Sequence, residues 1–190
     1  MISNRRLSKE EINALPLRYY NRFIKVLESE KGVFEACTNL KSESVLGFDT
    51  ETRPAFKTGQ YFLPSLLQLA GNNKVYLFRL NKIGLPLSLK SLLEDHSIIK
   101  TGVAVNQDVK EMLKISDFYP RNFIDLGDLS RSKGLKHHGL RGLAALLLNF
   151  RISKGSRTSN WDVEILTDNQ IKYAATDAWV SRKIYFSLSN

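Results

Sequence analysis

The sequence predicts an α/β domain of three layers, in which helices flank a mixed, partly antiparallel sheet. The apolar segments 64–71 and 74–80 are separated by the turn sequence Gly-Asn-Asn-Lys, which is typical of a β-hairpin. Further strand-like segments alternate along the chain with segments of helical periodicity. A hairpin makes an antiparallel pair, whereas strand–helix–strand units make parallel pairs, so a chain with both favours a mixed sheet.

The individual elements follow from local patterns. Ser8 and Glu11 have the spacing of a capping box, which predicts a short helix that ends before Pro16. Alternating or compact apolar runs predict strands, and apolar residues three and four apart predict helices. The expected strands are 22–29, 44–49, 64–71, 74–80 and 97–103, and the expected helices are 31–42, 87–95, 105–114, 140–150 and 167–188.

Length and composition limit the classes of protein. The chain has 190 residues, which fits one domain over residues 21–190 preceded by an N-terminal arm over 1–20, expected to be loosely attached, that carries the short helix. The net charge of +9 favours a polyanionic partner such as nucleic acid. The single cysteine, Cys37, excludes a disulfide framework and a cysteine zinc site, and it fits a cytoplasmic protein.

No apolar run reaches the ~18 residues of a membrane span, and the first ten residues lack an apolar signal core. We therefore expect no membrane partner. A Walker loop is also absent from the sequence, so we expect no nucleoside triphosphate to be bound. A monomer is the favoured oligomeric state.

Two carboxylates follow an apolar run in the stretch Val-Leu-Gly-Phe-Asp-Thr-Glu-Thr. Asp49 and Glu51 are two residues apart, so on a strand they would face the same side. Like charges so placed repel each other unless a cation lies between them or one is protonated. The alternative is that the strand has ended and both carboxylates are solvated in a loop.

Two other acidic residues, Asp177 and Asp108, lie on predicted helices. Tyr173 and Asp177 are four residues apart on a predicted helix, where alanines would permit close packing against a sheet. The alternative is an exposed aspartate beside a half-buried tyrosine. Asp108 lies in the first turn of another predicted helix, where it could merely compensate the helix dipole.

Taken together in this order, the three segments "FDTE", "GVAVNQD" and "YAATDA" resemble the 3′–5′ exonucleases of the four-carboxylate superfamily, in the subclass that carries a tyrosine. The stretch from Ser159 to Tyr185 is especially similar to the Werner-type and ribonuclease D branch. The resemblance covers about residues 22 to 187. It implies a ribonuclease H-like fold and a hydrolase that releases nucleoside 5′-monophosphates from nucleic-acid 3′ ends, with DNA favoured over RNA.

The resemblance also implies roles for these residues, and the chemistry accounts for them. Two divalent ions, Mg²⁺ or Mn²⁺, can activate a water and stabilise the leaving oxygen, and carboxylates are suitable ligands. Asp49 would contact both ions, Glu51 and Asp177 would complete one site, and Asp108 would position the second ion. A phenol with a pKa near ~10 is a poor base at neutral pH, so Tyr173 would orient the attacking water. Thr52 would contact the terminal nucleotide.

A basic stretch lies between the third and fourth carboxylates in sequence. Residues 129–161 contain seven lysines and arginines and no acidic residue, so they could attract phosphates towards the metals. Arg141, Lys154 and Arg157 are the expected phosphate contacts, and Trp161 could stack on a base. The alternatives are a solvated basic surface and a Trp161 that packs against its own helix.

Two other functions remain open at this point. A module that keeps the fold could bind nucleic acid without hydrolysing it, although all the positions of the carboxylate and tyrosine set are present. An endonuclease or a nucleotidyl transferase of the same broad fold would not need the pair Tyr173 and Asp177.

Overall fold

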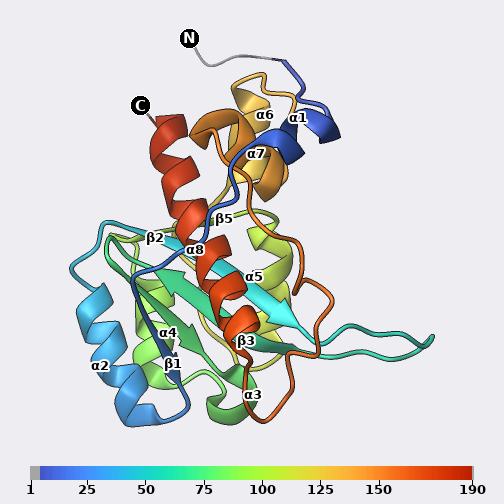
Figure 1. The fold of residues 1–190 in the computed structure, drawn as a ribbon. Coiled ribbons are helices and arrows are strands. Elements are labelled where there is room, and N and C mark those ends of the chain that lie inside the picture. The colour runs from blue at the N-terminus through green and yellow to red at the C-terminus, as the bar shows by residue number, and fades with distance from the viewer. Residues whose placement is uncertain (1–4, 190) are drawn as a thin grey trace.

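The computed structural model describes residues 5–189 and places one mixed sheet between two layers of helices (Figure 1). The sheet has six strands in the order β1-β4-β3-β2-β5-β6. β3 is antiparallel to both of its neighbours, whereas all other adjacent pairs are parallel. The predicted partly antiparallel sheet is therefore confirmed. The strands are β1 Phe23–Leu27, β2 Val45–Thr52, β3 Pro64–Ala70, β4 Lys74–Phe78, β5 Ile99–Gly102 and β6 Phe123–Asp125.

The helices that were predicted from periodicity or from a capping box are all present. They are α1 Lys9–Ala14, α2 Glu30–Leu40, α4 Leu87–Glu94, α5 Val105–Leu113, α7 Leu140–Leu148 and α8 Asp168–Ser189. The capping box predicted for α1 forms between Ser8 and Glu11, and α8 begins with a similar pair of bonds between Thr167 and Gln170. The sequence reasoning missed strand β6 and the helices α3 Leu80–Ile83 and α6 Leu126–Ser132, which are too short for a clear periodic pattern.

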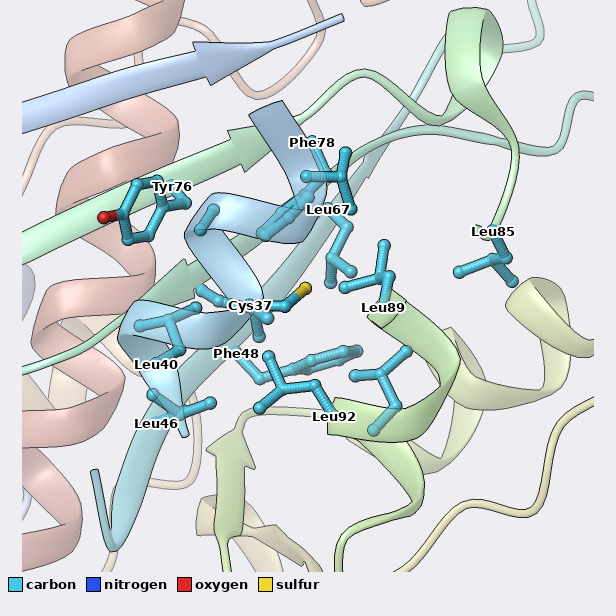
Figure 2. Close-up of a cluster of buried hydrophobic side chains, with 14 of the residues drawn as sticks. Cys37, Leu40, Leu46, Phe48, Leu67, Tyr76, Phe78, Leu85, Leu89 and Leu92 are labelled. Carbon is cyan, nitrogen blue, oxygen red and sulfur yellow. The ribbon is translucent and has the colours of Figure 1, made fainter. Parts of the chain in front are cut away.

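One face of the sheet packs against α2, α4 and α5 through a continuous apolar core. Figure 2 shows Cys37 and Leu40 of α2, Phe48 of β2 and Leu92 of α4 meeting in this core. The Phe48 ring also makes an edge contact with Phe123 at a centroid distance of 5.2 Å. Because side chains alternate along a strand, Leu46 and Phe48 point into this core while Gly47 points to the opposite face.

The opposite face is covered by the long helix α8 (Figure 1). Ala174, Ala175 and Ala178 are fully buried where α8 crosses the sheet. A Cβ atom at Gly47 of β2 would lie 1.8 Å from the carbonyl oxygen of Ala178, so only glycine permits this contact. The predicted close approach of an alanine-lined helix to the sheet is thus confirmed, with Gly47 as its counterpart on the strand.

The N-terminal segment is attached to the rest of the domain over the residues that the structure describes. Arg151 donates its backbone N–H to Pro16 and accepts one from Arg18, each at 3.0 Å. Tyr20 is buried beside α8, and its backbone N–H donates to Thr176 Oγ1 at 3.0 Å. The expectation of a loosely attached arm is therefore wrong for this part of the chain. The helices among residues 5–189 include none long and apolar enough to cross a membrane.

Gly47→Ala tests whether the contact between α8 and β2 is as tight as the structure indicates. The added methyl group would overlap the backbone of Ala178, so α8 must move, and we expect a loss of about 3 kcal/mol in the free energy of unfolding. Urea denaturation measures this change. Gly139→Ala is the matched control, because a Cβ atom there meets no atom within 4 Å. An equal loss in both variants would contradict the steric explanation.

Candidate active site

Three carboxylates meet where α8 crosses the end of β2. β2 continues to Thr52, so Asp49 and Glu51 lie within the strand and on its α8 side, not in a solvated loop. Asp177 reaches them from α8, next to Ala178, which contacts Gly47. One oxygen from each of the three carboxylates lies within 4.8 Å of the others. The predicted meeting of this strand and this helix is confirmed.

Burial and mutual repulsion both disfavour the charged forms of these groups. Burial first, and then the charges of Asp177 and Asp108, raise the pKa of Asp49 well above its usual value. Burial and the neighbouring carboxylates raise the pKa of Glu51 to about 10. Burial also raises the pKa of Asp177 to about 7, although the Tyr173 hydroxyl partly opposes this rise. Among residues 5–189, no lysine or arginine forms an ion pair with these three carboxylates.

The cluster has the chemistry of a site for a hard divalent cation. It consists of carboxylate oxygens alone, which Mg²⁺ and Mn²⁺ prefer. Asp177 Oδ1 is buried and has no hydrogen-bond partner among residues 5–189, although buried polar atoms normally have one. A cation would supply the missing partner and stabilise all three charges. Asp49, Glu51 and Asp177 are thus residues that could bind metal.

Asp108 lies beside this cluster but is not part of it. It belongs to α5, on the other face of the sheet, and its Oδ1 accepts a hydrogen bond from Thr50 Oγ1 at 2.7 Å. Burial raises the pKa of Asp108 to about 6, while the bond from Thr50 opposes the rise. Its charge nevertheless reaches Asp49 and Glu51, whose pKa values it raises. The charge of Asp108 would therefore also act on a second cation bound near Asp49.

Sequence reasoning missed Asp125, which holds the helix that carries Asp108. The residue before α5, Ala104, has a left-handed backbone with φ 61° and offers no capping side chain. Asp125, at the end of β6, accepts the Val105 N–H through Oδ2 and the Asp128 N–H through Oδ1, each at 3.0 Å. It thus caps α5 and α6 together. An acidic residue directly after the apolar pair Phe123 and Ile124 was the available signal.

The Tyr173 side chain is half-buried next to the carboxylates. Burial raises its pKa, and the charges of Asp177, Glu51 and Asp49 raise it further. The phenol is therefore protonated at neutral pH and can donate a hydrogen bond. It lines a cleft of about 710 Å³ together with Asp177.

The expected phosphate contacts line the same cleft. Arg141 of α7, together with Lys154 and Arg157 of the segment that follows, contributes side chains to the lining. Lys154 and Arg157 are exposed, and no acidic residue within the described chain forms an ion pair with them or with Arg141. The geometry therefore brings basic side chains to the carboxylate cluster.

Comparison with known proteins agrees with this arrangement. A model of the 3′–5′ exonuclease family matches residues 24–190. The chain belongs to this family. The mouse (Mus musculus) bifunctional 3′–5′ exonuclease/ATP-dependent helicase WRN is 35% identical over 157 residues, which cover 80% of this chain and 11% of the mouse protein. Ribonuclease D of Haemophilus influenzae is 30% identical over 166 residues, which cover 86% of this chain and 41% of the relative. This exonuclease-family chain thus spans less than half of either relative.

Solved structures confirm the ribonuclease H-like fold of this exonuclease-family chain. The Nibbler EXO domain of Aedes aegypti has a TM-score of 0.78 at 21% identity, covering 98% of this chain and 91% of that domain. The catalytic core of RRP6 from Trypanosoma brucei has a TM-score of 0.80 at 15% identity, covering 95% of this chain and 54% of that core. At such identities the likeness establishes the fold alone.

Trp161 and Thr52, which were both expected to contact the substrate, differ in how far they are exposed. Trp161 is fully buried, with its ring centroid 6.1 Å from that of Tyr173. Its ring exposes no face to a nucleotide, so the structure corrects the expectation of base stacking and gives Trp161 the alternative packing role. Thr52 is half-exposed at the end of β2, where the pairing with β3 is irregular, and its contact with a terminal nucleotide stays a prediction.

The raised pKa values predict an unusual pH dependence of stability in the metal-free protein. In the unfolded chain these carboxyl groups release protons near pH ~4, whereas Asp108 and Asp177 in the folded chain retain them to about 6 and 7. Between these values the folded state binds more protons, so the free energy of unfolding falls as pH rises. We expect a decrease on the order of a few kcal/mol from pH 5 to pH 8, measured by urea denaturation in chelator.

Asp177→Asn is the control for this measurement, because it removes one of the buried charges at almost the same volume. Its stability should fall less between the two pH values. Added Mn²⁺ should stabilise the unaltered protein more at pH 8 than at pH 5, since it binds ionised carboxylates. Identical pH profiles for the protein and the variant would contradict the assignment.

Proposed function

We propose that this chain hydrolyses phosphodiester bonds at the 3′ ends of nucleic acid and releases nucleoside 5′-monophosphates with the help of two divalent cations. One observation carries the proposal. Asp177 and Tyr173 line a cleft that also carries basic side chains, among them Arg141, Lys154 and Arg157, and the carboxylates of Asp49 and Glu51 lie next to that of Asp177. The basic side chains can attract a polyanion, and a carboxylate cluster that reaches the cleft through Asp177 suits the metal-dependent cleavage of a phosphate ester.

In this proposal the cation ligands fall into two groups. Asp49, Glu51 and Asp177 would hold one ion. Asp108 would position the second ion, which Asp49 would also contact. Bound ions would supply a water that is nucleophilic at neutral pH and stabilise the charge on the leaving oxygen. Thr50 keeps the Asp108 carboxylate oriented, since it donates its hydroxyl to Oδ1.

The other side chains position the substrate. The protonated Tyr173 hydroxyl can hydrogen-bond to the attacking water and orient it towards phosphorus, because its raised pKa excludes a role as base near pH 7. Arg141, Lys154 and Arg157 can bind the backbone phosphates. Thr52, at the end of β2, is placed for the terminal nucleotide.

DNA is the predicted substrate, although the relatives include proteins named for either nucleic acid. DNA polymerase I of Aquifex aeolicus is 29% identical over 156 residues, and ribonuclease D of Haemophilus influenzae is 30% identical over 166. We propose to compare DNA and RNA oligonucleotides of one sequence, labelled at the 5′ end. Products that shorten from the 3′ end support the exonuclease, whereas binding without cleavage supports the alternative of a binding module.

Removal of the cations or of their shared ligand should abolish hydrolysis. Asp49→Ala deletes the carboxylate that both ions would use, so we expect a loss of at least about 10³-fold in turnover. Excess chelator should have the same effect and should be reversed by Mg²⁺ or Mn²⁺. Gel analysis of a 5′-labelled oligonucleotide measures both losses. Full activity in chelator would contradict the two-cation proposal.

Tyr173→Phe should slow turnover without changing the requirement for metal. It keeps the ring and its packing against Trp161 but loses the hydrogen bond to the water, so we expect about 10²-fold lower turnover. Asp177→Asn removes a ligand and should also raise the Mg²⁺ concentration needed for half-maximal rate. Titration of Mg²⁺ at saturating substrate separates the two variants. If both shift the Mg²⁺ midpoint equally, Tyr173 belongs to the metal site.

A further inference from the structure

The N-terminal segment forms part of the wall of the candidate active-site cleft. Arg6 and Leu7 and the first turns of α1, with Ser8, Lys9 and Ile12, line the same cleft as Tyr173 and Asp177. These residues lie outside the part of the chain that the exonuclease family model matches, which begins at residue 24. The family assignment therefore gives no role to the N-terminal part of the cleft wall.

Several contacts hold this part of the wall in place. The Leu7 backbone N–H donates to His137 Nε2 at 2.9 Å, and Ile12 is buried. Asn13 of α1 accepts a hydrogen bond from the Arg141 guanidinium, so α1 also orients one of the expected phosphate contacts. In Figure 1, α1 lies beside α7, away from the sheet that carries Asp49 and Glu51. The segment is thus a fixed wall at a distance from the carboxylates.

Two basic side chains of this segment, Arg6 and Lys9, are free to bind an anion. Arg6 and Lys9 are exposed, and neither forms an ion pair with any residue of the range 5–189. The nearby Glu11 is already engaged, because it pairs with Arg5 at 2.6 Å and accepts the Ser8 N–H at 2.7 Å. Asp177 is the one acidic side chain among the described residues that line the cleft, and it belongs to the carboxylate cluster.

We infer that Arg6 and Lys9 form a phosphate-binding subsite for the nucleic-acid strand on the 5′ side of the scissile bond. The inference rests on the proposed function, in which the terminal phosphodiester lies at Asp49, Glu51 and Asp177. A strand that leaves this point carries one phosphate per nucleotide, and those phosphates need cations farther along the cleft. Arg6 and Lys9 supply them from α1 and the residues before it, and the substrate is therefore a strand several nucleotides long.

The double variant Arg6→Ala/Lys9→Ala tests this subsite. Binding of a single-stranded oligonucleotide of about 12 nucleotides is measured by fluorescence anisotropy in Mg²⁺, in an Asp49→Ala background so that the strand stays intact. Loss of two phosphate contacts should make the slope of log affinity against log salt shallower by about 1.4, which is about 25-fold weaker binding at 0.1 M salt. Lys31→Ala/Lys41→Ala is the control, because both lysines are exposed on or next to α2, on the other face of the sheet.

A second substrate distinguishes phosphate binding from support of the carboxylates. The p-nitrophenyl ester of thymidine 5′-monophosphate has a single phosphodiester and no upstream strand. With Asp49 present, Arg6→Ala/Lys9→Ala should hydrolyse this ester at the unaltered rate but should have a higher KM for the oligonucleotide. An equal loss on both substrates, or affinity and salt slope equal to those of the unaltered protein, would overturn the inference.

The same measurements separate this inference from the proposed function. Failure of the unaltered protein to shorten any oligonucleotide, with either Mg²⁺ or Mn²⁺, would contradict the exonuclease. Shortening by the unaltered protein with no change of affinity in the double variant would leave the exonuclease supported and contradict the subsite alone.

Discussion

The contact between Gly47 and Ala178 is the constraint on which the candidate active site depends. The backbone of α8 approaches β2 so closely that a methyl group on Gly47 would overlap the Ala178 carbonyl oxygen. Asp177 precedes Ala178, and Asp49 follows Gly47 by two residues on the same face of the strand. One backbone contact therefore fixes the distance between the carboxylates of β2 and α8, which are far apart in the sequence. A wider helix–sheet separation would move Asp177 out of reach of a shared cation.

The carboxylate cluster is unfavourable for the folded protein in the absence of a cation. Burial raises the pKa values of Asp49, Glu51 and Asp177, and repulsion from the neighbouring carboxylates adds to the rise for Asp49 and Glu51. The surrounding structure tolerates this because two apolar clusters, one on each face of the sheet, stabilise the strand and the helix that carry the charges. Strain of this kind concentrates at functional sites, where a bound ligand relieves it.

Residues outside the carboxylate cluster complete the surroundings of the site. The N-terminal segment is joined to the chain near Arg151 through backbone hydrogen bonds and lines the cleft on the α7 side. Asp125 caps α5 and thereby holds Asp108, although it is no member of the carboxylate cluster. The candidate site thus depends on residues that hold other residues in place.

The sequence alone determined the fold class, the helices with clear periodicity, and the residues of the carboxylate cluster with Tyr173. Periodicity and capping boxes are local patterns that extend over a few residues. Each acidic pair taken alone had a structural alternative, and the resemblance of three short segments to an exonuclease family selected the carboxylates and Tyr173. Short elements such as β6 and α6 escaped prediction because they contain too few residues for a periodic signal.

Only the tertiary structure decided which distant residues meet. It buried Trp161 against Tyr173, left Asp108 outside the cluster of the other three carboxylates, and brought α1 to the wall of the cleft. The physical reason is that burial and the distances between groups arise from packing among elements that are separate in the sequence. Local patterns in a single sequence specify which face of an element is apolar, but they do not specify the neighbour that covers it.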